Sequence, residues 1–134
     1  MKNKGFTLVE ILIVVIILGI LAAIVIPQFT NASSNAKVSS LTSDLQTIRD
    51  QIELYAVQHN DTYPTAGGFV AQMTATTDIS GNAGAGFGPY MQSVPTNPFT
   101  LTNTVGNGAY GASAWYYDGA GNFRANDTTA NGAY

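Results

Sequence analysis

The sequence predicts an α+β protein in which a long N-terminal helix packs on a small antiparallel β-sheet. An almost purely apolar segment, residues 6–26, is followed by apolar residues at helical spacing between positions 38 and 55. Beyond residue 60 the chain becomes rich in Gly, Asn, Thr and Ala, and two aromatic-containing runs flank a Gly-rich turn near its C-terminus. At 134 residues the chain is about one domain long.

The composition excludes several classes of function. The chain has no cysteine, which excludes a disulfide framework, a thiolate nucleophile and a Cys-based metal site. The formal net charge is −3, and without residues 1–5 three basic residues face eight acidic ones, for a net charge of −5. This charge argues against nucleic acid as a partner, because phosphate binding needs clustered Lys and Arg.

Residues 6–26 read FTLVEILIVVIILGILAAIVI and carry one charge, Glu10. About 20 apolar residues span a bilayer as a helix, and Lys2 and Lys4 before the segment favour a cytoplasmic N-terminus. A removable signal peptide is the alternative, but its apolar region is usually shorter. The sequence Leu-Ala-Ala at residues 21–23 is also a poor cleavage site, so we expect the segment to be retained.

Glu10 needs a physical explanation, because a carboxylate in a membrane helix costs about 2.5 to 3.5 kcal/mol on insertion scales. Glu10 could lie near the membrane edge and stay solvated, or it could meet a buried cation in an assembly. Cleavage after Gly5 would create such a cation, the α-amino group of Phe6. An unpaired buried charge is expensive, so such a pair would favour one register between subunits.

Residues 5–10, Gly-Phe-Thr-Leu-Val-Glu, followed by the apolar run, resemble the type IV prepilin signature of type IV pilins and type II secretion pseudopilins. The resemblance implies a pilin-like fold and a leader peptide, residues 1–5, that a prepilin peptidase removes between Gly5 and Phe6. It implies N-methylation of Phe6. It also implies that Glu10 pairs with the amino terminus of a neighbouring subunit during assembly.

Two residues that weaken helices lie in or beside the apolar segment. Pro27 lacks a backbone donor and clashes with the preceding turn, so it kinks or locally opens a helix. Gly19 weakens a helix by about 1 kcal/mol relative to Ala. Both match family positions, and filaments of the family can lose helical structure between them; the sequence leaves this open here.

Helical spacing returns after Pro27. The apolar stripe consists of Val38, Leu41, Leu45, Ile48, Ile52 and Tyr55. It covers less than three heptads, so we expect it to pack under a small domain rather than form a coiled coil. Arg49 and Glu53 are four residues apart and would form a weak pair. His59, the one histidine, is expected on the surface at the helix end.

The predicted organisation after the leader is a transmembrane or filament-core helix at 6–27, an amphipathic helix at 28–59 and a globular head at 60–134. In the head we expect a short helix near residues 69–73. A β-hairpin is expected from runs 114–117 and 123–125, with Tyr110 in another strand.

A weaker resemblance extends into the head. Residues 60–65 are similar to the segment after the long helix of major pseudopilins, and residues 115–118 to their hairpin. Tyr90 and residues 94–99 are similar to a Tyr, then hydrophobic-Pro-x-Asp-Pro pattern, in which Asn97 replaces the Asp. Without cysteine the chain lacks the disulfide loop of many type IV pilins, which favours the pseudopilin branch.

Calcium is the one metal that the head suggests, through the oxygens of Asp118, Asn122 and Asp127. Major pseudopilins can bind calcium in a C-terminal loop, but the spacing of residues 118–122 is better explained by a turn, and no cofactor is expected. The sequence has no recognisable nucleophile with a base partner and no phosphate-binding loop, so no enzyme is expected.

The leading function hypothesis is a structural subunit of a type IV pilus-like or type II secretion pseudopilus filament. The resemblance implies four partners: further copies of itself, a prepilin peptidase, an inner-membrane assembly platform and, before assembly, the lipid bilayer. It implies a place in the inner membrane, then in a filament in the periplasm or on the cell surface. The alternatives are a monomeric membrane-anchored binding domain, which would tolerate changes at Glu10, and a secreted domain with a disposable signal peptide.

Overall fold

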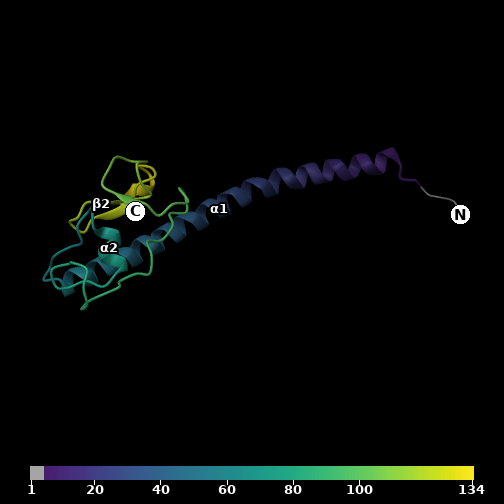
Figure 1. Ribbon diagram of the computed structural model, residues 1–134. Helices are drawn as coiled ribbons and strands as arrows, with labels where there is room; N and C mark the ends of the chain where they lie inside the picture. The colour runs from purple at the N-terminus through teal and green to yellow at the C-terminus, as the bar shows by residue number, and fades with distance from the viewer. Residues whose placement is uncertain (1–4) are drawn as a thin grey trace. The chain divides into compact units, whose positions relative to one another are not determined.

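The computed structural model describes residues 5–134. The leader prediction for residues 1–4, which include Lys2 and Lys4, lies outside the described residues. Helix α1 (Leu8–Gln58) runs through two compact units, of which the first ends at Ala36 and the second is Lys37–Tyr134. The second unit holds the C-terminal part of α1 and all other helices and strands, and is the folded head (Figure 1).

The predicted apolar stripe of α1 is the face that the head buries. Its fully buried members are Leu41, Leu45, Ile48, Ile52 and Tyr55. They form one core cluster with Phe69 and Met73 of helix α2 (Phe69–Thr74), and with aromatic side chains of the sheet. The stripe therefore packs under the head, and the short helix expected near residues 69–73 is confirmed.

Helix α1 ends in two residues with left-handed backbone conformation. Asn60 has φ 54° and Asp61 has φ 58°, and the Asp61 N–H donates to the Ala56 carbonyl at 2.9 Å. Asn and Asp adopt this conformation more easily than other side chains, and the bond satisfies a carbonyl of the last turn. The chain therefore leaves the helix at a capped end.

The sheet has three strands in the order β1 (Val105–Gly106), β2 (Trp115–Tyr117) and β3 (Phe123–Ala125). Strands β2 and β3 form the predicted antiparallel hairpin, with Tyr117 opposite Phe123. Trp115, Tyr117 and Phe123 are buried against the helix. The Trp115 indole N–H donates to the Pro95 carbonyl at 2.8 Å.

The sheet is mixed, not antiparallel throughout, because β1 pairs parallel to β2. A parallel connection normally needs a long crossover. Here β1 has only two residues and is about 7 Å long, at roughly 3.3 Å per residue. The loop of residues 107–114 therefore has only this short length to cross back before β2 begins. Tyr110 lies in this loop and not in a strand, so its assignment to a strand is wrong. Its ring instead stacks on the Arg124 guanidinium, 4.3 Å from the ring centroid.

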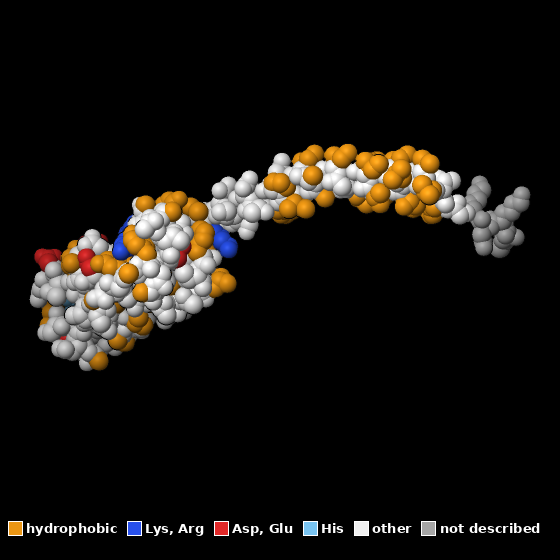
Figure 2. Space-filling view, turned by 90° about the horizontal axis from the view of Figure 1, so that it is seen from above, with side chains coloured by type: hydrophobic (Ala, Val, Ile, Leu, Met, Phe, Trp, Pro, Cys, Tyr) orange, Lys and Arg blue, Asp and Glu red, His pale blue; other side chains and the backbone are white. Residues whose placement is uncertain are grey.

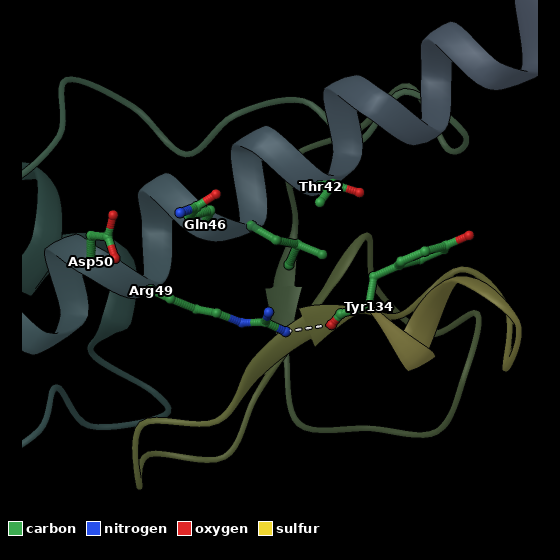
Figure 3. Close-up of a pocket in the computed structure, with 6 residues that line it drawn as sticks. Thr42, Gln46, Arg49, Asp50 and Tyr134 are labelled. Carbon is green, nitrogen blue, oxygen red and sulfur yellow. Dashed lines mark hydrogen bonds between the residues drawn. The ribbon is translucent and has the colours of Figure 1, made fainter.

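Arg49 does not form its side-chain pair with Glu53. Its Nε–H donates to the Phe123 carbonyl at 3.0 Å, and its Nη2 donates to the backbone oxygen of Tyr134 at 2.5 Å (Figure 3). Glu53 instead accepts a hydrogen bond from the Tyr63 hydroxyl at 3.2 Å. Arg49 thereby ties α1 to strand β3 and to the segment beyond the 3-10 helix η1 (Asn131–Ala133).

Candidate functional site

The peptide bond between Gly5 and Phe6 lies in non-helical chain just before α1 begins. Both residues are exposed, and the Phe6 side chain is 83% accessible. A Cβ added to Gly5 would meet no atom within 4 Å, so the packing of this chain does not require glycine there. An accessible, non-helical bond of this kind can enter the cleft of a peptidase.

Thr7 and Glu10 form a capping box at the start of α1. The carboxylate of Glu10 accepts from the Thr7 N–H at 2.8 Å and from the Thr7 hydroxyl at 2.7 Å. In return the Thr7 hydroxyl accepts from the Glu10 N–H at 3.3 Å. The two side chains satisfy backbone donors that the first helical turn leaves free.

The capping box gives Glu10 a role within its own chain that the sequence reasoning missed. The signal was present, because Thr-x-x-Glu before an apolar run is the sequence signature of a capping box. Glu10 is exposed, so it can exchange this contact for a cation supplied by another molecule. The sequence reasoning linked Glu10 with the amino group of Phe6 in a neighbouring subunit. The structure adds a contact of Glu10 with Thr7 of its own chain.

The N-terminal part of α1 has an apolar surface that its own unit does not cover. The large side chains of residues 8–26 are roughly half exposed or more, and Phe29 is 73% exposed. On the face seen in Figure 2, hydrophobic side chains cover this part of the helix. By length and composition α1 can cross a membrane. Such a surface requires a lipid or protein environment, since monomeric soluble proteins rarely expose patches of this size.

Helix α1 is continuous across Gly19 and Pro27. A Cβ at Gly19 would meet nothing within 4 Å, so no contact in the described chain demands glycine there. Pro27 has no N–H and leaves one carbonyl of the preceding turn without its helical partner. In the next turn the Thr30 hydroxyl donates to the Ile26 carbonyl at 3.2 Å. The structure thus contains the helical form at both residues, whereas the sequence left open whether the helix opens between them.

The three residues predicted as calcium ligands do not form one group. Asp118 and Asn122 close the β2–β3 turn: the Asp118 carboxylate accepts from the Ala120 N–H at 2.7 Å and from the Asn122 N–H at 3.2 Å. Asp127 follows β3 at the end away from this turn. There Asp127 accepts from Asn131. Calcium binding by these residues stays a prediction.

His59 is buried, so its placement on the surface is wrong. Its ring stacks on Tyr55 with centroids 3.8 Å apart. Nδ1 lies 2.8 Å from the Tyr55 carbonyl, and Nε2 lies 3.0 Å from the Thr77 hydroxyl. Both ring nitrogens are therefore occupied by structural hydrogen bonds. The helix-end position suggested solvent, but the chain folds back and covers the ring, which local sequence does not encode.

Comparisons with known proteins place the chain among relatives. The family model described as "Prokaryotic N-terminal methylation motif" matches residues 1–26. The type II secretion system core protein G of Pseudomonas aeruginosa is 34% identical over 99 residues, covering 73% of this chain and 69% of that protein. Core protein G of Escherichia coli K12 is 30% identical over 114 residues, covering 81% and 78%.

A shorter stretch of the chain matches another protein at higher sequence identity. The type IV major fimbrial protein FimA of Dichelobacter nodosus is 52% identical over 51 residues, covering 38% of this chain and 33% of that protein. No solved structure matches the chain significantly.

Proposed function

Because this chain belongs to the family of the type II secretion system core protein G, we propose that it is a structural subunit of a filament that assembles through α1. The observation that carries the proposal is the exposed apolar surface of residues 8–26, which begins beside the capped Glu10. Copies of the same helix can cover this surface for one another, with the heads facing solvent. The role is structural rather than catalytic.

Processing comes before assembly in this proposal. A prepilin peptidase cleaves between Gly5 and Phe6, and the new amino group of Phe6 is methylated. Support comes from the exposure of this bond and from the methylation motif matched over residues 1–26. Before assembly the chain crosses the inner membrane once, and an assembly platform in that membrane feeds it into the filament.

Glu10 selects the register between subunits by leaving the cap and pairing with the Phe6 ammonium of a neighbour. The exchange replaces two local hydrogen bonds from Thr7 with an ion pair between subunits. In a low-dielectric bundle an unpaired charge is strongly unfavourable, so misregistered subunits are rejected. Gly19 and Pro27 would allow the helix to adjust within the bundle.

A secretion pseudopilus is favoured over a long surface pilus. This chain aligns with more than two thirds of the length of each of the two core protein G relatives, but with only a third of the length of FimA. The lack of cysteine agrees with this choice. The filament would then extend into the periplasm.

Variants at the capping box test the proposal. Glu10→Gln keeps an acceptor for the cap but removes the charge. Thr7→Val removes the hydroxyl of the cap, at a cost of about 0.5–2 kcal/mol of helix stability, but keeps the charge. We expect both to insert in the membrane and to mature to Phe6 by mass analysis, with filaments formed by Thr7→Val and none by Glu10→Gln.

Normal filaments from Glu10→Gln would overturn the pairing of Glu10 with a neighbour. A mature chain that still begins at Met1 and stays monomeric in its native cell would instead support the membrane-anchored binding domain. A mature N-terminus beyond residue 23 would support a secreted domain.

A further inference from the structure

Leu101 combines two features that are uncommon together in a leucine. Its backbone φ is 57°, in the left-handed region. Among the described residues outside glycine, the others with positive φ are Asn60 and Asp61, whose side chains tolerate it. The Leu101 side chain is also 75% exposed, so it adds nothing to the core of the head.

The loop of residues 97–102 imposes this conformation. The Leu101 N–H donates to the Asn97 carbonyl and the Asn97 N–H donates to the Thr102 carbonyl, both at 2.9 Å. The fully buried Asn97 side chain anchors the loop through its Nδ2, which donates to the Ala114 carbonyl at 3.0 Å. These hydrogen bonds hold the Leu101 backbone in its left-handed conformation, and the apolar side chain projects into solvent.

The loop lies at the end of the head where α1 enters it. The Phe99 ring, two residues before Leu101, faces the ammonium of Lys37, with Nζ 5.9 Å from the ring centroid. Lys37 is the first residue of the folded unit. Leu101 is thus presented at the part of the head next in sequence to the segment that polymerises under the proposed function.

Strain of this kind persists where the surrounding structure holds it in place, and such residues cluster at functional sites. Glycine would adopt the same backbone conformation without strain, so it is the leucine side chain that must be useful. Resting on the proposed function, we propose that Leu101 is an interface residue that inserts into an apolar depression on a second copy of the chain in the filament. A backbone that is already held in its bound conformation loses little entropy when a protein surface receives its side chain.

A lipid surface fits Leu101 less well. Its neighbours Thr100, Thr102 and Asn103 are polar, and the last two are exposed. Interfacial membrane binding draws on a broad apolar face with basic residues around it. One leucine among threonines lacks that breadth, whereas a pocket on a protein can be matched to one side chain.

Thiol labelling of Leu101→Cys tests the proposal, because the chain has no other cysteine. We compare the full-length variant in detergent, the same variant carrying Glu10→Gln in the membrane, and assembled filaments. We expect labelling in the first two states and about tenfold slower labelling in filaments, which corresponds to about 1.4 kcal/mol of protection. Protection of the variant carrying Glu10→Gln in the membrane would show that lipid, and not a second copy, covers Leu101, and would overturn the proposal. Full labelling in filaments would also overturn it.

Leu101→Gly provides an independent readout. It should leave the thermal midpoint of the full-length protein unchanged or raised, because strain is relieved, while filament yield falls about tenfold. Val57→Ala is the matched control, since Val57 is 73% exposed but lies in relaxed helix, and its yield should stay near wild type. Equal losses in both variants, or no loss with Leu101→Gly, would overturn the proposal.

The same experiments separate this inference from the proposed function. If the unmodified chain forms no filaments in its native cell, the proposed function fails and the inference fails with it. If filaments form and Leu101 stays reactive and replaceable in them, the inference alone fails.

Discussion

At the scale of single residues, Asn97 joins three parts of the head through one amide. Its Oδ1 accepts from the Phe99 N–H at 2.8 Å, and its Nδ2 donates to the Ala114 carbonyl at 3.0 Å and lies 3.5 Å from Asp127 Oδ1. Nδ2 faces two acceptors, so this position needs a donor. The family pattern that residues 94–99 resemble has an aspartate at this position. An ionised aspartate here would place a carboxylate against the Ala114 carbonyl and the Asp127 carboxylate.

Asn97→Asp should therefore destabilise the head by about 3 kcal/mol at neutral pH, the cost of a buried acceptor, or charge, without a partner. The loss should shrink on acidification, because a protonated carboxyl regains a donor. Urea unfolding of the full-length protein in detergent measures both effects. Asn107→Asp, at an exposed position, is the control and should stay within about 0.5 kcal/mol of wild type. A neutral result at Asn97 would mean that the amide contacts contribute little.

The residues of the candidate site divide by how local their signals are. Gly5, Phe6 and Glu10 follow from a contiguous motif; in the structure Gly5 and Phe6 precede α1, and Glu10 lies in its first turn. The cap formed by Thr7 is equally local in sequence. It was missed because the cost of placing the Glu10 carboxylate in an apolar segment was explained by a cation from another subunit. The φ of Leu101 could not be predicted, because it is imposed by a buried amide bound to a residue in a distant loop.

At the scale of elements, two turns of the head are built alike. Both read Asp-x-x-Gly-Asn: residues 78–82 and 118–122. In each, the Asp carboxylate accepts from the backbone N–H of the residues two and four positions on, and from the Asn side chain. The glycines have φ 79° and 92°, and a Cβ at Gly121 would lie 3.0 Å from the Tyr63 ring. The turns thus require an ionised Asp and a glycine.

The Asp118 turn should make the head sensitive to acid. Burial, the largest single influence, raises the pKa of Asp118, but hydrogen bonds from Asn122 and the Ala120 N–H together hold that pKa below its usual range. A pKa lowered by folding stabilises the native state above the unfolded value, about 3.9. That stability is lost as pH falls through the folded value.

We therefore expect the thermal midpoint to fall as the pH drops below about 4. Asp118→Asn should have a lower midpoint than wild type at neutral pH and a shallower fall in acid. Asp50→Asn, on the exposed side of α1, controls for net charge and should follow the wild-type curve. An Asp118→Asn curve parallel to wild type would contradict the assignment of acid sensitivity to this turn.

Elements with a strong local pattern were predictable. The stripe of α1, helix α2 and the β2–β3 hairpin follow from periodicity and turn residues. Strand β1 was not, because two residues carry no alternation, and its pairing with β2 is fixed by a bond between distant residues, the Trp115 N–H to the Thr104 carbonyl at 2.9 Å.

At the scale of the whole molecule, the second unit is stabilised by its own core, whereas the first unit offers an exposed surface for filament assembly. The members of the core cluster lie between Leu41 and Ala125, so the head is stabilised by its own contacts. The residues of the first unit that the structure describes are exposed. Their apolar surface is available to stabilise an assembly, and it makes the separate chain dependent on lipid or detergent.

A chain shortened to begin at Lys37 should therefore fold without detergent, remain monomeric, and unfold with a thermal midpoint close to that of the full-length protein in mild detergent. It keeps the whole core cluster and the contacts of Arg49 with Phe123 and Tyr134. It loses the segment of α1 on which polymerisation depends. Sedimentation velocity and circular dichroism check the two halves of the expectation. An unfolded or aggregated product would show that the first unit supports the head, and ordered filaments formed by it would move the assembly surface away from the N-terminal helix.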